Sequence, residues 1–300
     1  MKGCNCGILN SYEGMQNMAR FTNQAQLRYG NAVANSNIAV GEILEVLSAT
    51  KTAVRTTYGQ NDHITYVISI VNSGNIAMTG LTLSDDLGAY AFGTGTVVPL
   101  TYVADTVRYY TNGVLQAAPA VNAGPPFTIN GISVPAGGNA TVVYEAALNE
   151  FAPLAAESTI GNTVTVSGGG ITPVTAQESI TAQSGPQLTI TKSVSPVPVT
   201  ENGALTYTFL IQNTGNTAAT PATGVMVTDT FDPVLSNIAV SFNGTTWAEP
   251  ANYSYNETTG EFVTQRGQVT VPAASFTQDA ATGAWTATPG VSTLIVTGIV

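Results

Sequence analysis

The 300-residue sequence has little of what many functional classes of protein require. It holds one histidine, His63, so a Ser-His-Asp triad or a histidine-based metal site has a single position to occupy. Eight lysine and arginine residues stand against 18 aspartate and glutamate residues, which leaves no basic face for nucleic acid or anionic lipid. We therefore expect no enzyme, no cofactor, no nucleic acid partner and no membrane partner.

Long hydrophobic runs are also missing. No apolar stretch approaches the roughly 20 residues of a membrane-spanning helix. The first residues, MKGCNCG, lack the continuous apolar segment of a secretory signal, and neither end carries a wall-anchoring signal. The sequence predicts either a leaderless protein released by cell lysis, as a spore-associated protein would be, or a protein whose signal has been removed.

The only two cysteines, Cys4 and Cys6, lie in a Gly- and Asn-rich tip that we assign to residues 1–20. Cysteines one residue apart are poorly placed to bridge each other, because disulfide geometry is demanding. We expect them to form intermolecular disulfides in an oxidising exterior. Idle thiols are one alternative, and a Cys-x-Cys metal site is another, although we predict no metal site.

Short β-branched runs separated by Gly and Pro fill the rest of the chain and predict an all-β fold. The segment Ile64–Asn75, ITYVISIVNSGN, recurs 141 residues later as Leu205–Asn216, LTYTFLIQNTGN. Both are alternating strands that end in an Asn/Gly turn. The repeat predicts two tandem β-sandwich domains, at residues 46–183 and 184–300.

The second repeat is shorter than the first. The first repeat finishes with the strand-like Ile160–Val166, and the same position in the second repeat falls beyond Val300. A sandwich without its last strand exposes unpaired backbone and apolar core. We therefore predict that the second sandwich is incomplete.

A segment that resembles the missing strand lies near the other end of the chain, in residues 21–45. Asn23 lies 28 residues before Lys51, much as Asn162 lies 30 residues before Lys192. Alternation puts one set of donor residues on the same face: Phe21, Asn23, Ala25 and Leu27.

These residues predict a donor strand followed by a linker. Insertion of the strand into the second sandwich of the next chain would make a head-to-tail homopolymer. The alternatives are that the strand folds back into its own second sandwich or pairs at an edge of the first.

Lysine occurs three times in the chain, and two of the three, Lys51 and Lys192, fall at equivalent positions of the repeat. Period-2 alternation turns both toward the apolar face. The same test turns two aspartates and two asparagines inward: Asp85, Asp229, Asn162 and Asn23.

Burial penalises a charged lysine, so each one needs a partner. A plain ion pair with the equivalent aspartate is one solution. The other is a neutral amine beside a neutral carboxylic acid, in which the amine attacks the asparagine amide and ammonia leaves. We predict isopeptide bonds of this second kind at two sites: Lys51, Asp85 and Asn162 within one chain, and Asn23, Lys192 and Asp229 between chains.

Four motifs resemble the conserved-repeat domain of bacterial surface proteins, domain of unknown function eleven. They are TKSVSP at 191–196, the YTF strand from Tyr207, VTDT at 227–230 and NTVTV at 162–166. The resemblance implies Ig-like sandwiches in surface, spore-appendage or pilus-like proteins of Gram-positive bacteria. It also implies Lys-Asn crosslinks, which some related sandwich families carry. The absence of a leader and a wall anchor departs from ordinary surface display and favours a spore appendage.

The function expected from these features is a structural subunit of an extracellular filament or spore surface. The alternative is a monomeric cell-surface adhesin that binds through loops at the sandwich ends. A calcium site at Asp85 and Asp86, or at Asp229 and Asp232, is a further alternative for the acidic residues.

Overall fold

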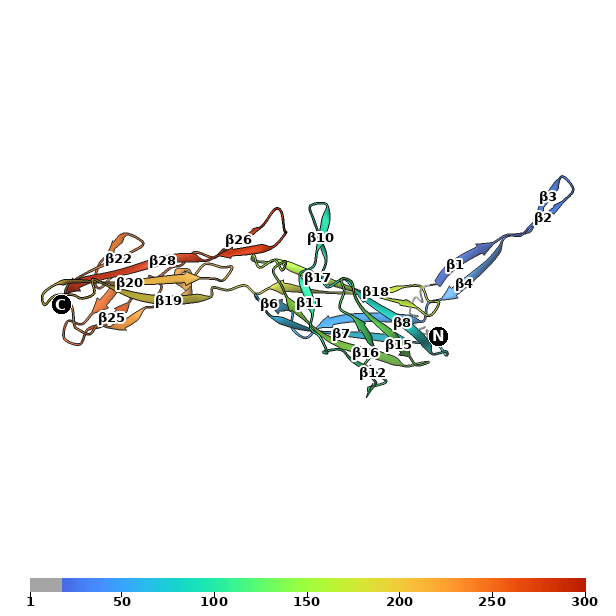
Figure 1. Cartoon of the computed structure of the whole chain (residues 1–300), viewed down its shortest axis with the longest axis horizontal. Coiled ribbons are helices and arrows are strands. Elements are labelled where there is room, and N and C mark those ends of the chain that lie inside the picture. Colours follow the sequence, from blue (N-terminus) through green and yellow to red (C-terminus); the bar gives the residue numbers. More distant parts are fainter. Residues whose placement is uncertain (1–17) are drawn as a thin grey trace, which may run out of the picture.

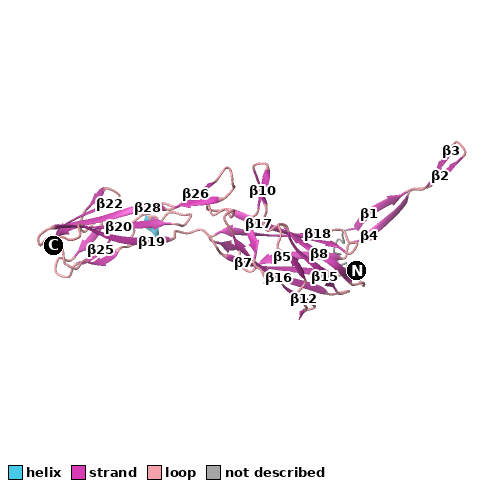
Figure 2. Ribbon diagram, viewed as in Figure 1, coloured by secondary structure: helices cyan, strands magenta, loops and turns pink. Residues whose placement is uncertain are grey.

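The computed structural model describes residues 18–300, and it is almost entirely β-structure (Figures 1 and 2). The prediction of an all-β, sandwich-forming chain is confirmed by this architecture. Cys4 and Cys6 lie outside the described residues, so the intermolecular disulfides stay a prediction. Within residues 18–300 no helix has the length and apolar character needed to cross a membrane.

The first sandwich consists of two facing sheets. One sheet has the strand order β13-β12-β16-β7-β5, with β11 also paired to β16, and the other has the order β14-β15-β8-β17-β18-β6. The bounds are β5 Leu47–Ala53, β6 Thr57–Tyr58, β7 His63–Asn72, β8 Met78–Asp85, β11 Leu100–Tyr102, β12 Arg108–Thr111, β13 Val114–Leu115, β14 Ala120–Asn122, β15 Phe127–Val134, β16 Asn139–Leu148, β17 Thr159–Gly168 and β18 Val174–Ala182. A side hairpin is formed by β9 (Tyr90–Phe92) and β10 (Gly95–Val97).

Alternation builds the core between these sheets. In β7 every second residue is fully buried, including Ile64, Tyr66 and Ile68, while the residues between them are partly exposed. Burying each such side chain contributes roughly 1.5–3 kcal/mol. The first core draws its buried residues from the span 47–182, and a second core draws on residues 205–296.

The second sandwich repeats this plan with fewer strands. Its larger sheet has the order β19-β20-β28-β22-β23, and its smaller sheet has the order β21-β25-β24. The bounds are β19 Leu188–Ser195, β20 Ala204–Asn213, β21 Thr228–Thr230, β22 Ser236–Phe242, β23 Thr245–Trp247, β24 Tyr253–Tyr255, β25 Glu261–Thr264 and β28 Gly290–Ile299, with a short 3-10 helix at Pro221–Thr223.

The repeated Asn-x-Gly motif has the same structure in both sandwiches. Asn72 donates from Nδ2 to the carbonyl of Ile76 at 2.8 Å and accepts from the amide of Gly74 at 2.9 Å. Asn213 does the same with Thr217 and Gly215, at 2.8 and 2.9 Å. These buried asparagines hold the turn that follows the central strand, which explains why the motif recurs.

The smaller sheet of the second sandwich lacks two strands rather than one. In the first sandwich β8 pairs with β15 on one side and with β17 on the other, and β17 in turn pairs with β18. In residues 18–300 β21, the counterpart of β8, pairs only with β25. The predicted absence of a final strand is therefore correct but incomplete, because β18 also has no counterpart.

The N-terminal segment forms a long hairpin that projects away from the first sandwich (Figure 1). Strand β1 (Met18–Asn23) pairs with β4 (Ala39–Leu44), and β2 (Gln26–Tyr29) pairs with β3 (Ala32–Asn35). Residues 24–25 interrupt the strand expected over 21–27, and the expected linker is itself paired into the hairpin, whereas the role of the segment as a donor stays a prediction. Backbone groups of an isolated strand need partners, and residues 26–44 supply them. Neither expected alternative, pairing with the second sandwich or with an edge of the first, occurs in the described residues.

A second hairpin connects the two sandwiches. It consists of β26 (Ser275–Gln278) and β27 (Trp285–Thr288), and it extends from the second sandwich to the first (Figure 1). Gln278 Nε2 and Trp285 Nε1 both donate to the Tyr90 hydroxyl, at 3.0 and 3.1 Å, and the Trp285 amide donates to the carbonyl of Glu150 at 2.7 Å. These bonds tie the hairpin of the second sandwich to the first sandwich.

Candidate crosslinking site

The first sandwich buries a lysine, an aspartate and an asparagine from three different strands. Lys51 lies on β5, Asp85 ends β8, and Asn162 lies on β17, which pairs beside Asp85. Their exposed fractions are 3%, 1% and 0%. Each sits where the alternation of its strand turns a side chain into the core, so the three predicted residues meet between the sheets.

A continuous series of hydrogen bonds, which passes through Tyr144, links these three side chains. Lys51 Nζ lies 2.6 Å from Asp85 Oδ2. The Tyr144 hydroxyl donates to the same oxygen at 2.7 Å and accepts from Asn162 Nδ2 at 3.1 Å. Asp85 Oδ1 accepts from the amide of Leu87 at 3.0 Å, so the carboxylate is fixed at both oxygens.

Burial changes the acid-base behaviour of the groups around the site. Desolvation lowers the pKa of Lys51 below its usual value, and the adjacent Asp85 partly opposes that change. Desolvation likewise raises the pKa of Tyr144 well above its usual value, so this phenol remains a neutral donor. Transfer of one proton from Lys51 to Asp85 across 2.6 Å produces an uncharged amine and an uncharged acid.

Within residues 18–300, only one of the two polar atoms of the Asn162 side chain, Nδ2, has a hydrogen-bond partner. Asn162 Oδ1 is buried and has no hydrogen-bond partner in the described part of the chain. A buried acceptor without a donor costs about 1–3 kcal/mol. The predicted crosslinking would require a proton donor at this oxygen, because polarising the carbonyl prepares it for attack by a neutral lysine.

The arrangement suits a single condensation. In the crosslink predicted from the sequence, a bond would form between Lys51 Nζ and the side-chain carbonyl carbon of Asn162, and the bond between that carbon and Nδ2 would break. Ammonia would carry away Nδ2, its two hydrogens and one hydrogen from the amine. Asp85 would pass the protons and be unchanged at the end, so such a site would act once and not turn over.

Tyr144 is the residue of this site that sequence reasoning missed. It lies on β16 directly opposite Tyr66 of β7, and Lys51 Nζ sits 4.8 Å from the centre of the Tyr66 ring. Tyr66 has an equivalent in Tyr207, so the repeat itself was a signal that an aromatic residue belongs beside each lysine. The repeat gives no such signal for Tyr144. In the second sandwich the residue paired with Tyr207 is Val296, not a tyrosine.

Replacing Tyr144 with phenylalanine is expected to slow crosslinking at least about tenfold, because the variant loses the hydroxyl that joins Asp85 to Asn162. Intact mass followed after refolding measures the fraction of chains that have lost ammonia. Tyr109→Phe is the matched control, since its hydroxyl bonds the carbonyl of Ser133 at 2.6 Å outside the site. A Tyr144→Phe rate equal to that of the parent chain would show that the hydroxyl takes no part.

The second sandwich assembles only two of the three groups. Lys192 on β19 forms an ion pair with Asp229 on β21, and its Nζ lies 4.2 Å from the centre of the Tyr207 ring. The side chains of Lys192 and Asp229 are 37% and 18% exposed, against 0% and 2% for Lys51 and Asp85. The predicted third member, Asn23, lies at the end of β1 in the N-terminal hairpin and does not meet them within one chain.

Other acidic residues serve turns. Asp86 Oδ1 accepts from the amides of Gly88 and Thr163, both at 2.9 Å, as expected of a residue in the turn after a strand. Among residues 18–300 no three His, Cys, Asp or Glu side chains gather in a way that could hold a metal ion.

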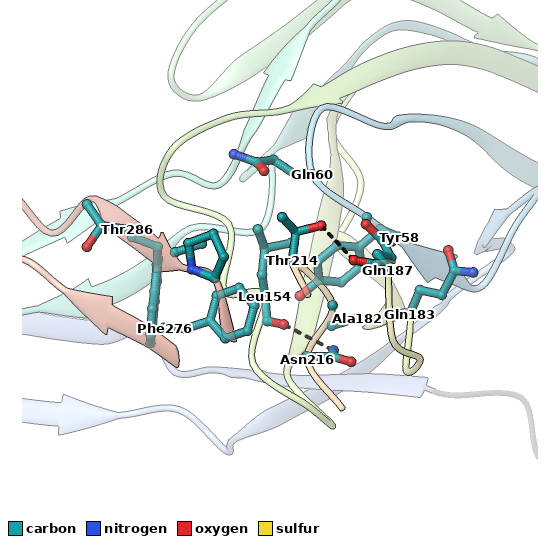
Figure 3. A pocket seen from close by; sticks show the side chains of 15 residues that line it. Tyr58, Gln60, Leu154, Ala182, Gln183, Gln187, Thr214, Asn216, Phe276 and Thr286 are labelled. Atoms are coloured by element: carbon teal, nitrogen blue, oxygen red, sulfur yellow. Dashed lines mark hydrogen bonds between the residues drawn. The ribbon is translucent and has the colours of Figure 1, made fainter. Parts of the chain in front are cut away.

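A hollow of about 390 Å³ lies between the two sandwiches (Figure 3). Its lining comes from the first sandwich, the second sandwich and the β26–β27 hairpin, and it includes Tyr58, Phe276 and Trp285. Asn216 crosses it to donate to the carbonyl of Leu154 at 3.1 Å. The lining holds no ionisable group except the Tyr58 phenol, whose hydroxyl already donates to the carbonyl of Pro153 at 2.6 Å.

Comparisons with known proteins add little beyond the class of fold. No protein-family model matches the chain, and no curated protein matches it in sequence. The pilus backbone RrgB from Streptococcus pneumoniae is similar at 13% identity and a TM-score of 0.33, over 81% of this chain and 55% of that one. The major pilin BcpA of Bacillus cereus is similar at 9% identity and a TM-score of 0.34, over 91% and 73%.

A third similar structure belongs to a different class. AvmM, which catalyses macrocyclization in alchivemycin A biosynthesis, is similar at 14% identity and a TM-score of 0.30, over 49% of this chain and 93% of that one. Likenesses at this level join pilins and an enzyme, so they carry no argument about what the chain does. The functional argument rests on the chain's own residues.

Proposed function

We propose that the chain is a structural subunit of an extracellular, pilus-like fibre that assembles head-to-tail with copies of itself. One observation carries this proposal. Lys192 and Asp229 stand in the second sandwich as Lys51 and Asp85 stand in the first, but the strand that brings Asn162 to the first pair has no counterpart there. The two predicted repeats, 46–183 and 184–300, are the units of the subunit.

The incomplete sandwich presents a surface suited to strand addition. In the described chain one edge of β21 has no strand partner, and such an edge offers free N–H and C=O groups to another chain. Next to it β19 exposes Ile190 at 51% and Val194 at 41%. In the first sandwich β17 pairs along the equivalent edge of β8, and β18 packs across the equivalent face of β5.

The donor is the N-terminal segment of the next copy, with Phe21, Asn23, Ala25 and Leu27 as its inward residues. The hairpin that carries it and the second sandwich lie at opposite ends of the long axis of the molecule (Figure 1). An interface between two different surfaces of identical chains does not close on itself when the surfaces lie end to end. Repeated addition therefore produces a filament, and on the family resemblance a spore appendage is one form of it.

The junction carries the same chemistry as the interior of the first sandwich. With Asn23 at the position of Asn162, Lys192 Nζ of one copy bonds to the side-chain carbonyl carbon of Asn23 of the next, and ammonia leaves. Docking buries Lys192 and supplies the desolvation that Lys51 already has. The result is a covalent bond at every subunit junction.

Electron microscopy of the concentrated protein tests the proposal. The full chain should form fibres of uniform width, and a chain lacking residues 1–30 should remain monomeric, because it has lost β1 and β2. Deletion of residues 1–17 is the control, since it keeps the whole hairpin and should still polymerise. Fibres formed without residues 1–30 would disprove strand donation, whereas monomers of the full chain would favour a binding module.

A further inference from the structure

The strand β18, not β17, covers the lysine-bearing strand of the first sandwich. β17 pairs with β8 and brings Asn162 to Asp85, whereas β18 packs across the face of β5. Ile180 and Ala182 of β18 are 0% and 3% exposed, and they belong to the same core cluster as Leu47 of β5. A single strand added at the edge of β21 would therefore leave the face of β19 uncovered.

The exposed residues of β19 show what that second strand would bury. Ile190 and Val194 share a face with Lys192 by alternation, and all three are exposed in the second sandwich. The equivalent face of β5 is covered, and there Lys51 is 3% exposed. Complete burial of Lys192 thus needs a counterpart of β18 as well as a counterpart of β17.

The N-terminal hairpin has the two strands in the required order. β17 and β18 form an antiparallel hairpin that precedes β19, and β1 and β4 form an antiparallel hairpin that precedes β5. In the first case Asn162 pairs with Glu178, and in the second Asn23 pairs with Ala39. If the N-terminal hairpin is superposed on the β17–β18 hairpin so that Asn23 coincides with Asn162, then β4 coincides with β18.

Register then assigns the inward positions of β4. In the first hairpin Ile160, two residues before Asn162, pairs with Ile180. In the second Phe21, two residues before Asn23, pairs with Gly41. The inward positions of β4 are Ala39, Gly41 and Ile43, and Val40 falls on the opposite face.

We infer that the donated element is the whole hairpin of residues 18–44, in which β1 and β2 take the place of β17 and β4 takes the place of β18. The occupant of the groove is a second copy of this chain. The hairpin exposes Leu27 at 64% and Tyr29 at 62% in the isolated chain. This inference rests on the proposed fibre function and adds a second strand to its interface.

Two synthetic peptides added to the full-length chain separate the hairpin from a single strand. The probes are residues 18–44 and residues 18–30, and the measurement is the peptide concentration that halves fibre elongation, followed by light scattering. The longer peptide should act at a concentration about tenfold or more below that of the shorter one, because it alone covers β19. Intact mass should also show the internally crosslinked chain plus the longer peptide, less one further ammonia.

Two substituted forms of the longer peptide test whether its greater potency comes from its inward residues or only from its length. Ile43→Asp in the longer peptide puts a charge at an inward position and should remove its advantage. Val40→Asp, on the opposite face, should keep it.

The outcomes separate this inference from the proposed function. Equal potency of the two unsubstituted peptides, or equal loss of potency from the two substitutions, would overturn the hairpin and leave single-strand donation standing. Fibres that grow unaffected by either peptide would overturn strand donation itself.

Discussion

Replacing Asp85 with alanine is expected to restore one ammonia to the mass of the chain. The parent chain should be lighter than its sequence by one ammonia, because Lys51 and Asn162 condense inside the first sandwich. The variant loses the carboxylate that lies 2.6 Å from Lys51 Nζ and passes the protons, so its mass should equal that of its own sequence. Intact mass spectrometry of the folded, unassembled protein makes the measurement.

The same variant should also lose stability. By analogy with a disulfide, a bond from Lys51 to Asn162 closes a loop of 111 residues and stabilises the fold by ~4–5 kcal/mol on the chain-entropy model. The variant forfeits this amount and leaves Lys51 buried without its partner. Denaturant unfolding should therefore show a much lower midpoint than that of the parent chain.

Asp229→Ala is the matched control for this experiment. It removes the equivalent aspartate from the second sandwich, where no strand of the described chain takes the place of β17 and its Asn162, so the unassembled protein should still lack one ammonia. A parent mass equal to the sequence mass, measured on folded protein, would show that Lys51 and Asp85 form an ion pair and nothing more.

Fibres of the Asn23→Ala variant are expected to fall to monomers in hot detergent with reductant, whereas parent fibres should give a ladder of covalent oligomers. The variant hairpin can still dock through backbone hydrogen bonds and apolar residues, so assembly itself should survive. It cannot condense with Lys192, because alanine has no amide carbon to attack. Denaturing gel electrophoresis of purified fibres distinguishes the two results.

Asn31→Ala provides the comparison for this second variant. Asn31 lies in the turn between β2 and β3, outside the predicted contact with Lys192, and its loss should leave the ladder intact. Parent fibres that dissolve completely to monomer in the presence of reductant would contradict the intermolecular isopeptide bond.

Both expectations depend on residues whose roles were visible in the sequence to different degrees. Lys51 and Asp85 could be paired from the sequence, because alternation turned each of them inward and a buried charge needs a partner. Asn162 could be added on the same grounds. Tyr144 could not, since its hydroxyl reaches Asp85 only through the register of β16 against β7, which no local pattern encodes.

The second sandwich also separates what the sequence reveals from what only the structure reveals. Counting residues along the repeat revealed a missing strand, and the recurrence of Asn23 pointed to its donor. The count could not reveal that β18 also lacks a counterpart, because β18 has no motif that repeats. The proposal that two strands are donated depends on the packing of β18 across β5 and on the exposure of Ile190 and Val194, where that packing is missing.

The sequence by itself determined the all-β class, the repeat and the inward lysines, because a period of two residues assigns each side chain to one face of a sheet. The tertiary structure alone decided which faces meet. It placed a tyrosine between aspartate and asparagine, and it turned an expected strand and linker into a hairpin. Contacts between strands far apart in the chain depend on how sheets register and stack, and local alternation carries no record of either.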